Sequence, residues 1–140
     1  MEKNPSFKLL NMKRYLVYLL TGLLSWVVPF VIGIGFHNKE GQLLVNQDLF
    51  KSVMVVTGTL TGMLLLSYLY NKGKIRSVAD ALWVGIIWLG VNWIFDIFIL
   101  LPVAKLSFDN YYQQIGLRYL SILIICWFTG RIAFKRGRSV

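Results

Sequence analysis

The chain has 140 residues, of which 56% are apolar and only 15% are charged, and its formal net charge is +9. Soluble domains usually carry about a quarter charged residues, so this composition excludes an ordinary soluble domain. The basic residues form short clusters between long apolar runs. Membrane topology produces this pattern, and we therefore expect a single membrane domain and no nucleic-acid partner.

Four apolar runs are long enough to cross a lipid bilayer as helices. About 20 helical residues cover the roughly 30 Å of the hydrocarbon core, and the runs lack the polar–apolar alternation of barrel strands. The predicted fold is an all-α, integral membrane, four-helix antiparallel bundle. A basic head (residues 1–14) precedes the transmembrane domain (15–134), and a basic tail (135–140) follows it. The spans are expected at residues 15–36, 52–70, 78–101 and 110–134.

The ends of these helices carry sequence signals. The first run exceeds the roughly 7–15 residues of a signal-peptide core, and no small-residue cleavage site follows, so we expect it to be retained as a span. Asp48 is expected to cap the second helix. Ser77-Val-Ala-Asp80 is a capping box at the start of the third helix, and Pro102 is expected to end that helix.

The distribution of Lys and Arg predicts the orientation in the membrane. Eleven of the 15 lie in the head, in the turn at residues 71–76 and near the C-terminal end, whereas four lie on the opposite side. The richer side faces the cytoplasm. We therefore expect a multi-pass protein of the cell membrane with both termini cytoplasmic and with anionic lipids bound at that face.

Small residues at intervals of three or four predict close helix packing. On one helix face they let a neighbouring backbone approach. Proline within such a face also removes a backbone donor, which predicts a kink and permits a cavity there. A GxxxG pattern in the second span fits contacts within the bundle, to a second copy or to another membrane protein. The residues are Gly22, Ser25, Pro29 and Gly33 in the first span, and Gly58 and Gly62 in the second.

Two charged residues are expected inside the membrane. Asp80 and Asp96 enclose 15 uncharged residues, about 22 Å of helix, which is too short to cross about 30 Å. Arg118 and Arg131 enclose 12, about 18 Å. Asp80 and Arg131 fit the basic side, so Asp96 and Arg118 are the embedded residues. We predict that they form an ion pair.

Polar residues near this pair predict a lined pocket. Asn92 lies one turn before Asp96, and three polar residues share a face of the fourth helix with Arg118. Ionisable residues inside membranes are candidates for functional sites, but a structural salt bridge, or an arginine reaching outward to the membrane surface, fits the same pattern. The expected pocket residues are Asn92, Tyr111, Gln114 and Ser121.

The usual residues of catalytic, metal and nucleotide sites are missing from the sequence. The only cysteine, Cys126, is expected on the opposite side of the membrane from the only histidine, His37, which has Glu40 nearby. A metal site needs several ligands at suitable spacing. No Ser-His-Asp set and no phosphate-binding glycine loop is found. We expect no metal, no cofactor and no catalytic residue, and an enzyme ranks last.

Three short patterns occur in chain order: Trp26-Val-Val-Pro-Phe30; Trp88, Asn92, Asp96 and Leu101-Pro102; and Asp109, Tyr112, Ile115-Gly116-Leu117 and Tyr119. With these patterns the sequence resembles, over roughly residues 12–135, a group of small four-helix prokaryotic membrane proteins of unknown function. The resemblance implies the fold and no activity.

Two functions fit the sequence. The first is a small transporter or channel-like protein in which Asp96 and Arg118 line a polar pocket. The second is a non-catalytic accessory or assembly subunit of a larger membrane complex, whose small-residue faces dock other helices. A homo-oligomer is compatible with both. The deep tryptophans Trp26, Trp88 and Trp93 are expected to serve as bulky packing residues.

Overall fold

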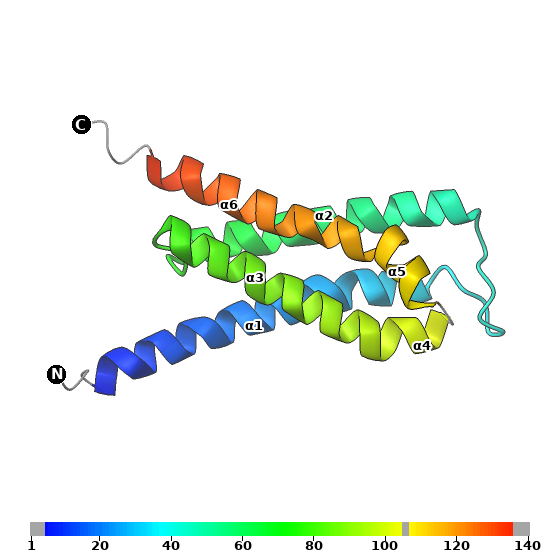
Figure 1. Ribbon diagram of the computed structural model, residues 1–140, viewed down its shortest axis with the longest axis horizontal. Helices are drawn as coiled ribbons and strands as arrows, with labels where there is room; N and C mark the ends of the chain where they lie inside the picture. Colours follow the sequence, from blue (N-terminus) through cyan, green and yellow to red (C-terminus); the bar gives the residue numbers. More distant parts are fainter. Residues whose placement is uncertain (1–4, 105–106, 136–140) are drawn as a thin grey trace.

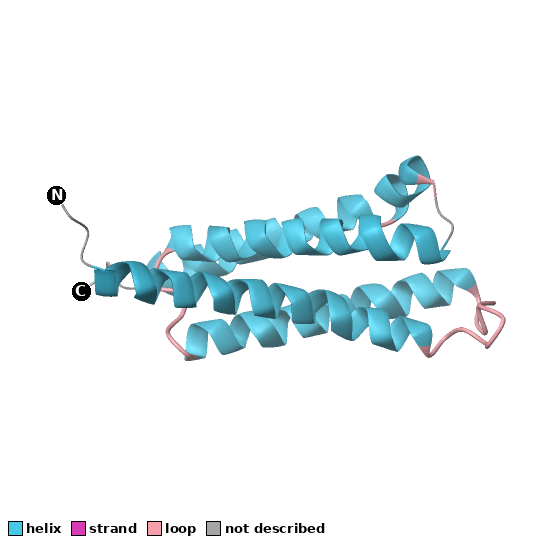
Figure 2. Cartoon of the chain, turned by 90° about the horizontal axis from the view of Figure 1, so that it is seen from below, coloured by secondary structure: helices cyan, strands magenta, loops and turns pink. Residues whose placement is uncertain are grey.

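The computed structural model describes residues 5–104 and 107–135, and for residues 5–11, 104, 114 and 135 it describes the backbone alone. These residues form helices joined by loops and turns. Four long helical rods lie side by side and alternate in direction, so the two ends of the chain lie at the same end of the bundle (Figures 1 and 2). The all-α prediction is confirmed.

Each rod contains a helix long and apolar enough to cross a membrane. The candidate spans are Met12–Ile34, Gln47–Asn71, Val78–Val103 and Phe108–Phe134. They match the predicted runs, although the second begins five residues earlier than expected. The elements are α1 (Pro5–Ile34), α2 (Gln47–Asn71), α3 (Val78–Phe95), the π-helical turn η1 (Asp96–Leu100), α4 (Leu101–Ala104), α5 (Phe108–Gln114), the 3₁₀ turn η2 (Gly116–Tyr119) and α6 (Leu120–Lys135).

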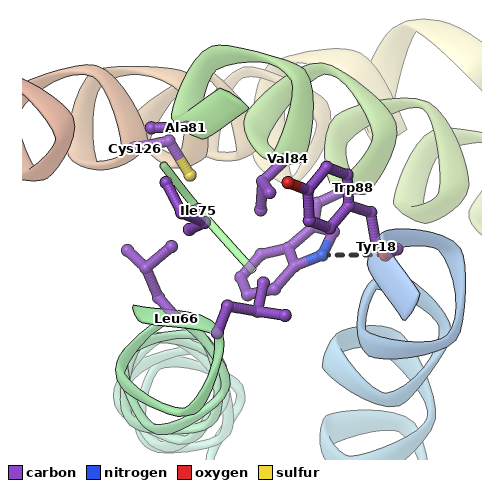
Figure 3. Close-up of a cluster of buried hydrophobic side chains, with 8 residues drawn as sticks. Tyr18, Leu66, Ile75, Ala81, Val84, Trp88 and Cys126 are labelled. Atoms are coloured by element: carbon purple, nitrogen blue, oxygen red, sulfur yellow. Dashed lines mark hydrogen bonds between the residues drawn. The ribbon is translucent and has the colours of Figure 1, made fainter. Parts of the chain in front are cut away.

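Helix α3 is the central element of the bundle. It packs against α1 on one side and against α6 on the other, while α2 packs against α1. The core lies near the end of the bundle that carries the chain termini, and Trp88 fills its centre (Figure 3). Most other large apolar side chains face outward, as membrane-facing residues do. The core residues are Tyr18, Leu66, Leu69, Ile75, Ala81, Val84, Trp88 and Cys126.

The helix starts agree in part with the predicted caps. Ser77 caps α3, since its side chain accepts from the Asp80 amide at 3.1 Å. The Asp80 carboxylate in turn accepts from the Arg76 amide at 3.0 Å, one residue before the cap. The predicted cap of α2 is wrong. Asn46 caps that helix by accepting from the Asp48 amide at 2.8 Å, and Asp48 lies in the first turn.

Helix α3 does not end at Pro102 as predicted. At Asp96 the helix widens into a π-turn, in which the Leu101 amide donates to the Asp96 carbonyl five residues earlier. Pro102 then lies at the second residue of α4, which extends to Ala104. Proline is tolerated in the first turn of a helix, because its missing N–H has no partner to serve there. The π-turn therefore lets the chain continue as a helix through Pro102.

The fourth rod is interrupted, although the sequence predicted one continuous helix. Ile115 departs from helical geometry with φ −126° and ψ −53°, and the chain then makes the 3₁₀ turn η2 before α6 begins. The Trp93 indole donates to the Gly116 carbonyl at 3.3 Å and fixes this break against α3. The break sets the directions of the side chains on either side of it.

The predicted small-residue faces contact different neighbours. A Cβ added at Gly22 would lie 2.9 Å from the Trp88 side chain, whereas one added at Gly33 would meet Met54 of α2 at 3.5 Å. Helix α1 continues through Pro29. In the GxxxG pattern, a Cβ added at Gly62 would lie 4.0 Å from the Trp88 side chain, whereas one added at Gly58 would meet nothing within 4 Å. Gly58 therefore makes no close packing contact with the described part of its own chain.

Candidate functional site

Helices α1 and α3 meet through buried polar groups as well as apolar ones. On α3, Trp88, Asn92 and Asp96 follow one another at intervals of four residues, so they share one face. That face lies against α1, and all three side chains are buried. We call this the polar α1–α3 interface. Interhelical hydrogen bonds of this kind join membrane helices, because lipid offers no alternative partner.

The first level of this interface is formed by Trp88, which is only 2% exposed. Its indole N–H lies 3.1 Å from the Tyr18 carbonyl oxygen (Figure 3) and 3.1 Å from the Thr21 hydroxyl oxygen. The Tyr18 hydroxyl donates to the Lys74 carbonyl at 2.7 Å. Buried tryptophans usually need an acceptor for this N–H. Trp88 therefore provides both packing volume and a fixed contact between α1 and α3.

The second level is formed by Asn92 and Ser25. The Asn92 amide group donates to the Ser25 hydroxyl oxygen at 3.1 Å and to the Trp88 carbonyl one turn earlier at 2.8 Å. The Ser25 hydroxyl donates to the Gly22 carbonyl at 2.7 Å. The predicted pocket residue Asn92 thus lies in a closed hydrogen-bonded contact between two helices.

The third level is the Asp96 carboxylate, which is 1% exposed. One oxygen accepts from the Trp26 indole N–H at 2.6 Å, and the other accepts from the Tyr111 hydroxyl at 3.0 Å. Aromatic rings surround the indole. The Trp26 ring stacks on Phe30 at 4.5 Å and lies 5.1 Å from Phe95, between ring centroids. Asp96 therefore joins α1, α3 and α5 in an apolar environment.

The structure brings together Asp96 and Tyr111, two of the predicted site residues, but it places Arg118 elsewhere. The Arg118 side chain is exposed, and the ion pair found among the described residues is a different one. The prediction assumed one continuous helix with Arg118 and Tyr111 on the same face. Because the helix is broken at Ile115 and in the turn η2, Arg118 does not share a face with Tyr111. The predicted Asp96–Arg118 ion pair therefore does not form.

Ser121, another predicted pocket residue, makes no hydrogen bond with Asp96. Ser121 is exposed, and its hydroxyl donates to the Arg118 carbonyl at 2.6 Å. The side chain of Gln114 lies outside the described part of the structure. Tyr119 of η2, which was not among the predicted site residues, faces the Asp96 carboxylate.

Arg14 and Asp80 form the ion pair that does occur. Their side chains meet at 3.2 Å and are largely buried, with 20% and 12% exposure respectively. The pair joins the start of the first candidate span to the start of α3, near the end of the bundle that holds the chain termini (Figure 1). No sequence pattern indicated this contact, because Arg14 belongs to a basic cluster that membrane topology alone explains.

The described residues contain no group of three or more His, Cys, Asp or Glu side chains that could hold a metal ion. Comparison with known proteins adds no assignment, since no family model, no curated protein and no solved structure matches the chain. The buried carboxylate of Asp96, which accepts hydrogen bonds from Trp26 and Tyr111, is the strongest candidate for a functional site.

Proposed function

We propose that the chain is an integral membrane protein with four spans and with both termini on the cytoplasmic side. The four long apolar helices and the outward-facing apolar side chains support the insertion. The excess of Lys and Arg near the chain termini and in the turn at residues 71–76 supports the orientation.

Cysteine labelling tests this topology. In a Cys126→Ala background, a cysteine at Gln42 in the α1–α2 loop should react with an impermeant maleimide added to intact cells. A cysteine at Asn71, at the opposite end of α2, should react only after permeabilisation. Both positions are exposed. Labelling of Asn71→Cys but not Gln42→Cys in intact cells would reverse the orientation, and equal labelling of both would contradict a spanning α2.

Within this topology, we propose that the protein is a small transporter or channel-like protein in which Asp96 binds the transported cation. The observation that carries the proposal is the buried carboxylate itself. Asp96 lies 16 residues after Asp80, about 24 Å along the helix. An acidic side chain at the centre of a membrane helix costs roughly 2.5–3.5 kcal/mol, and Asp96 lies off-centre, where this cost is smaller. The described structure supplies two neutral donors to offset this cost, and no basic side chain pairs with Asp96 there.

Ion flux in liposomes tests this function. Purified protein is reconstituted into liposomes that contain indicators for H⁺, Na⁺ or K⁺. We expect flux of one of these cations above that of empty liposomes, and we expect Asp96→Asn to reduce it to that background. Asp109→Asn, an exposed carboxylate on α5, is the matched control and should keep the flux. Absence of flux in the parent protein, or full flux in Asp96→Asn, would contradict the proposal.

An accessory or assembly subunit is the second candidate function, and two observations favour it. Arg118 is exposed within the candidate span Phe108–Phe134, where a partner's carboxylate would relieve the cost of its charge. Gly58 is open on α2, where a helix of a homo-oligomer or of another membrane protein would fit. Co-purification of a stoichiometric partner that is lost in Arg118→Gln would favour this function over transport.

A further inference from the structure

We propose that the cation bound by Asp96 is a proton, and that it binds at Oδ2, the oxygen that faces Tyr111. This inference deepens the proposed function and rests on it for the location of the site inside the membrane. The geometry of the two hydrogen bonds to the carboxylate and the lack of space around it support the assignment.

The coordination capacity of the site is too small for a metal cation. Hard cations such as Ca²⁺ take six to eight oxygen ligands, and Mg²⁺ demands a near-octahedral set. Among the described residues Asp96 is the only carboxylate with contacts at this site, and each of its oxygens already accepts one hydrogen bond, which leaves about one lone pair per oxygen. The Trp26 indole can donate but has no lone pair to offer a cation. A proton needs only one lone pair on one oxygen.

The space around Asp96 is also too small for a larger cation. The carboxylate is 1% exposed, the Trp26 indole donates to it, and the rings of Phe30 and Phe95 pack against that indole. A groove of about 270 Å³ does exist in the bundle, but α2 and α6 line it, with residues such as Leu66 and Ile125. An organic cation or a hydrated metal ion would have to displace aromatic side chains at Asp96, whereas a proton would not.

The two donors assign the proton to one oxygen. An indole N–H donates in every protonation state, so Oδ1 must remain an acceptor for Trp26. A tyrosine hydroxyl both donates and accepts. When H⁺ binds, a new O–H bond forms at Oδ2 and the carboxylate charge is neutralised. The Tyr111 hydroxyl then rotates and accepts from the Asp96 O–H. Release returns the same proton to water and restores the original hydrogen bond, with no oxidation or reduction.

The other titratable groups around Asp96 are tyrosines, which ordinarily lose their proton only at about pH 10. The titratable side chains facing it are Tyr111 from α5 and Tyr119 from η2, while α1 contributes only the indole of Trp26. Among the described residues no charged side chain forms an ion pair with it. The nearest acidic residue along α3 is Asp80, which is paired with Arg14 near the other end of that helix.

Infrared difference spectroscopy of the protein in liposomes tests the proposal. Between mildly alkaline and mildly acidic buffer, we expect a carboxyl C=O stretching band to appear at a position typical of a buried carboxyl group. The chain has six carboxylic side chains, so assignment by variants is practicable. Asp96→Asn should remove the band, and Asp109→Asn should keep it. Exchange of Na⁺ for K⁺ or choline at constant pH should leave the spectrum unchanged.

Two further variants locate the proton. Tyr111→Phe should shift the pH midpoint and the position of the band, because it removes the partner at Oδ2. Trp26→Phe should change the position but keep the titration. If Asp96→Asn fails to fold, Tyr111→Phe and Trp26→Phe still test the assignment of the proton to Oδ2. A band that survives in Asp96→Asn, a midpoint and band unaffected by Tyr111→Phe, or a response to Na⁺ or K⁺ at constant pH would overturn the proposal. The measurement needs no flux, so proton binding without transport would contradict only the proposed function.

Discussion

Replacing Trp88 by alanine is expected to lower the free energy of unfolding by about 3–5 kcal/mol, the cost of truncating a large buried aromatic side chain. Trp88 fills the centre of the core (Figure 3), and its indole N–H donates to the Tyr18 carbonyl and the Thr21 hydroxyl of α1. Alanine removes the packing and leaves α1 without this contact. Unfolding followed in detergent by circular dichroism, with a denaturant series, measures the loss.

Two variants separate packing from hydrogen bonding at this position. Trp88→Phe keeps much of the ring volume but removes the N–H, so it should cost less than alanine, about 1–3 kcal/mol. Trp83→Ala changes the same residue type on the same helix, but Trp83 is 49% exposed. Its main contact is an edge-on approach to the Tyr15 ring, which predicts a loss of about 0.5–1.5 kcal/mol. Equal losses for Trp83→Ala and Trp88→Ala would contradict the core described above.

Replacing Asp96 by leucine is expected to cost about 2–5 kcal/mol, although leucine suits a membrane helix better than aspartate. The change leaves the Trp26 N–H and the Tyr111 O–H buried without an acceptor, at about 1–3 kcal/mol each. Asp96→Asn should cost much less. Its carbonyl oxygen still accepts from Trp26, and its amide group donates to the Tyr111 oxygen. Thermal unfolding in detergent compares the two variants.

A double-mutant cycle isolates the contribution of the hydrogen bond between Trp26 and Asp96. In a Trp26→Phe background the indole N–H is absent, so Asp96→Leu leaves only the Tyr111 hydroxyl without an acceptor. Trp26→Phe combined with Asp96→Leu should therefore cost less than the sum of the two single changes. Asp109→Leu, at an exposed position of α5, is the control and should cost less than about 1 kcal/mol. Additive effects in the double variant would show that the two side chains do not interact.

The sequence predicted the four rods, although not the break in the fourth, because each rod rests on a long apolar run. Apolar runs of about 20 residues identified the four rods, and Ser77 with Asp80 identified the start of α3. The distance to Asp80 predicted that Asp96 lies inside the membrane, and the structure buries its carboxylate between helices. The rods and the start of α3 depend on local sequence, so the lengths of apolar runs and the capping residues are enough to find them.

The partner of Asp96 was predicted wrongly because it depends on side-chain direction across a helix break. The charges of Asp96 and Arg118 suggested an ion pair, but the departure at Ile115 separates Arg118 from Tyr111. Instead, Asp96 accepts from Trp26, which the sequence analysis treated as a packing residue. One signal was present: a buried tryptophan needs an acceptor for its N–H, and Asp96 lies at a similar depth on a neighbouring helix.

The number of residues in the π-turn sets the direction in which the chain continues after Asp96. In an α-helix, each residue added or removed rotates everything that follows by about 100°. The turn from Asp96 to Leu100 sets the direction of α4, and the chain then returns through α5, where the Tyr111 hydroxyl donates to the Asp96 carboxylate. Deleting one residue from this turn would therefore rotate α4 and the chain after it, and Tyr111 would no longer face Asp96. In contrast, the exposed α1–α2 loop around Gly41 absorbs changes of length. Related sequences that keep this site must therefore keep the spacing here, even where the side chains differ.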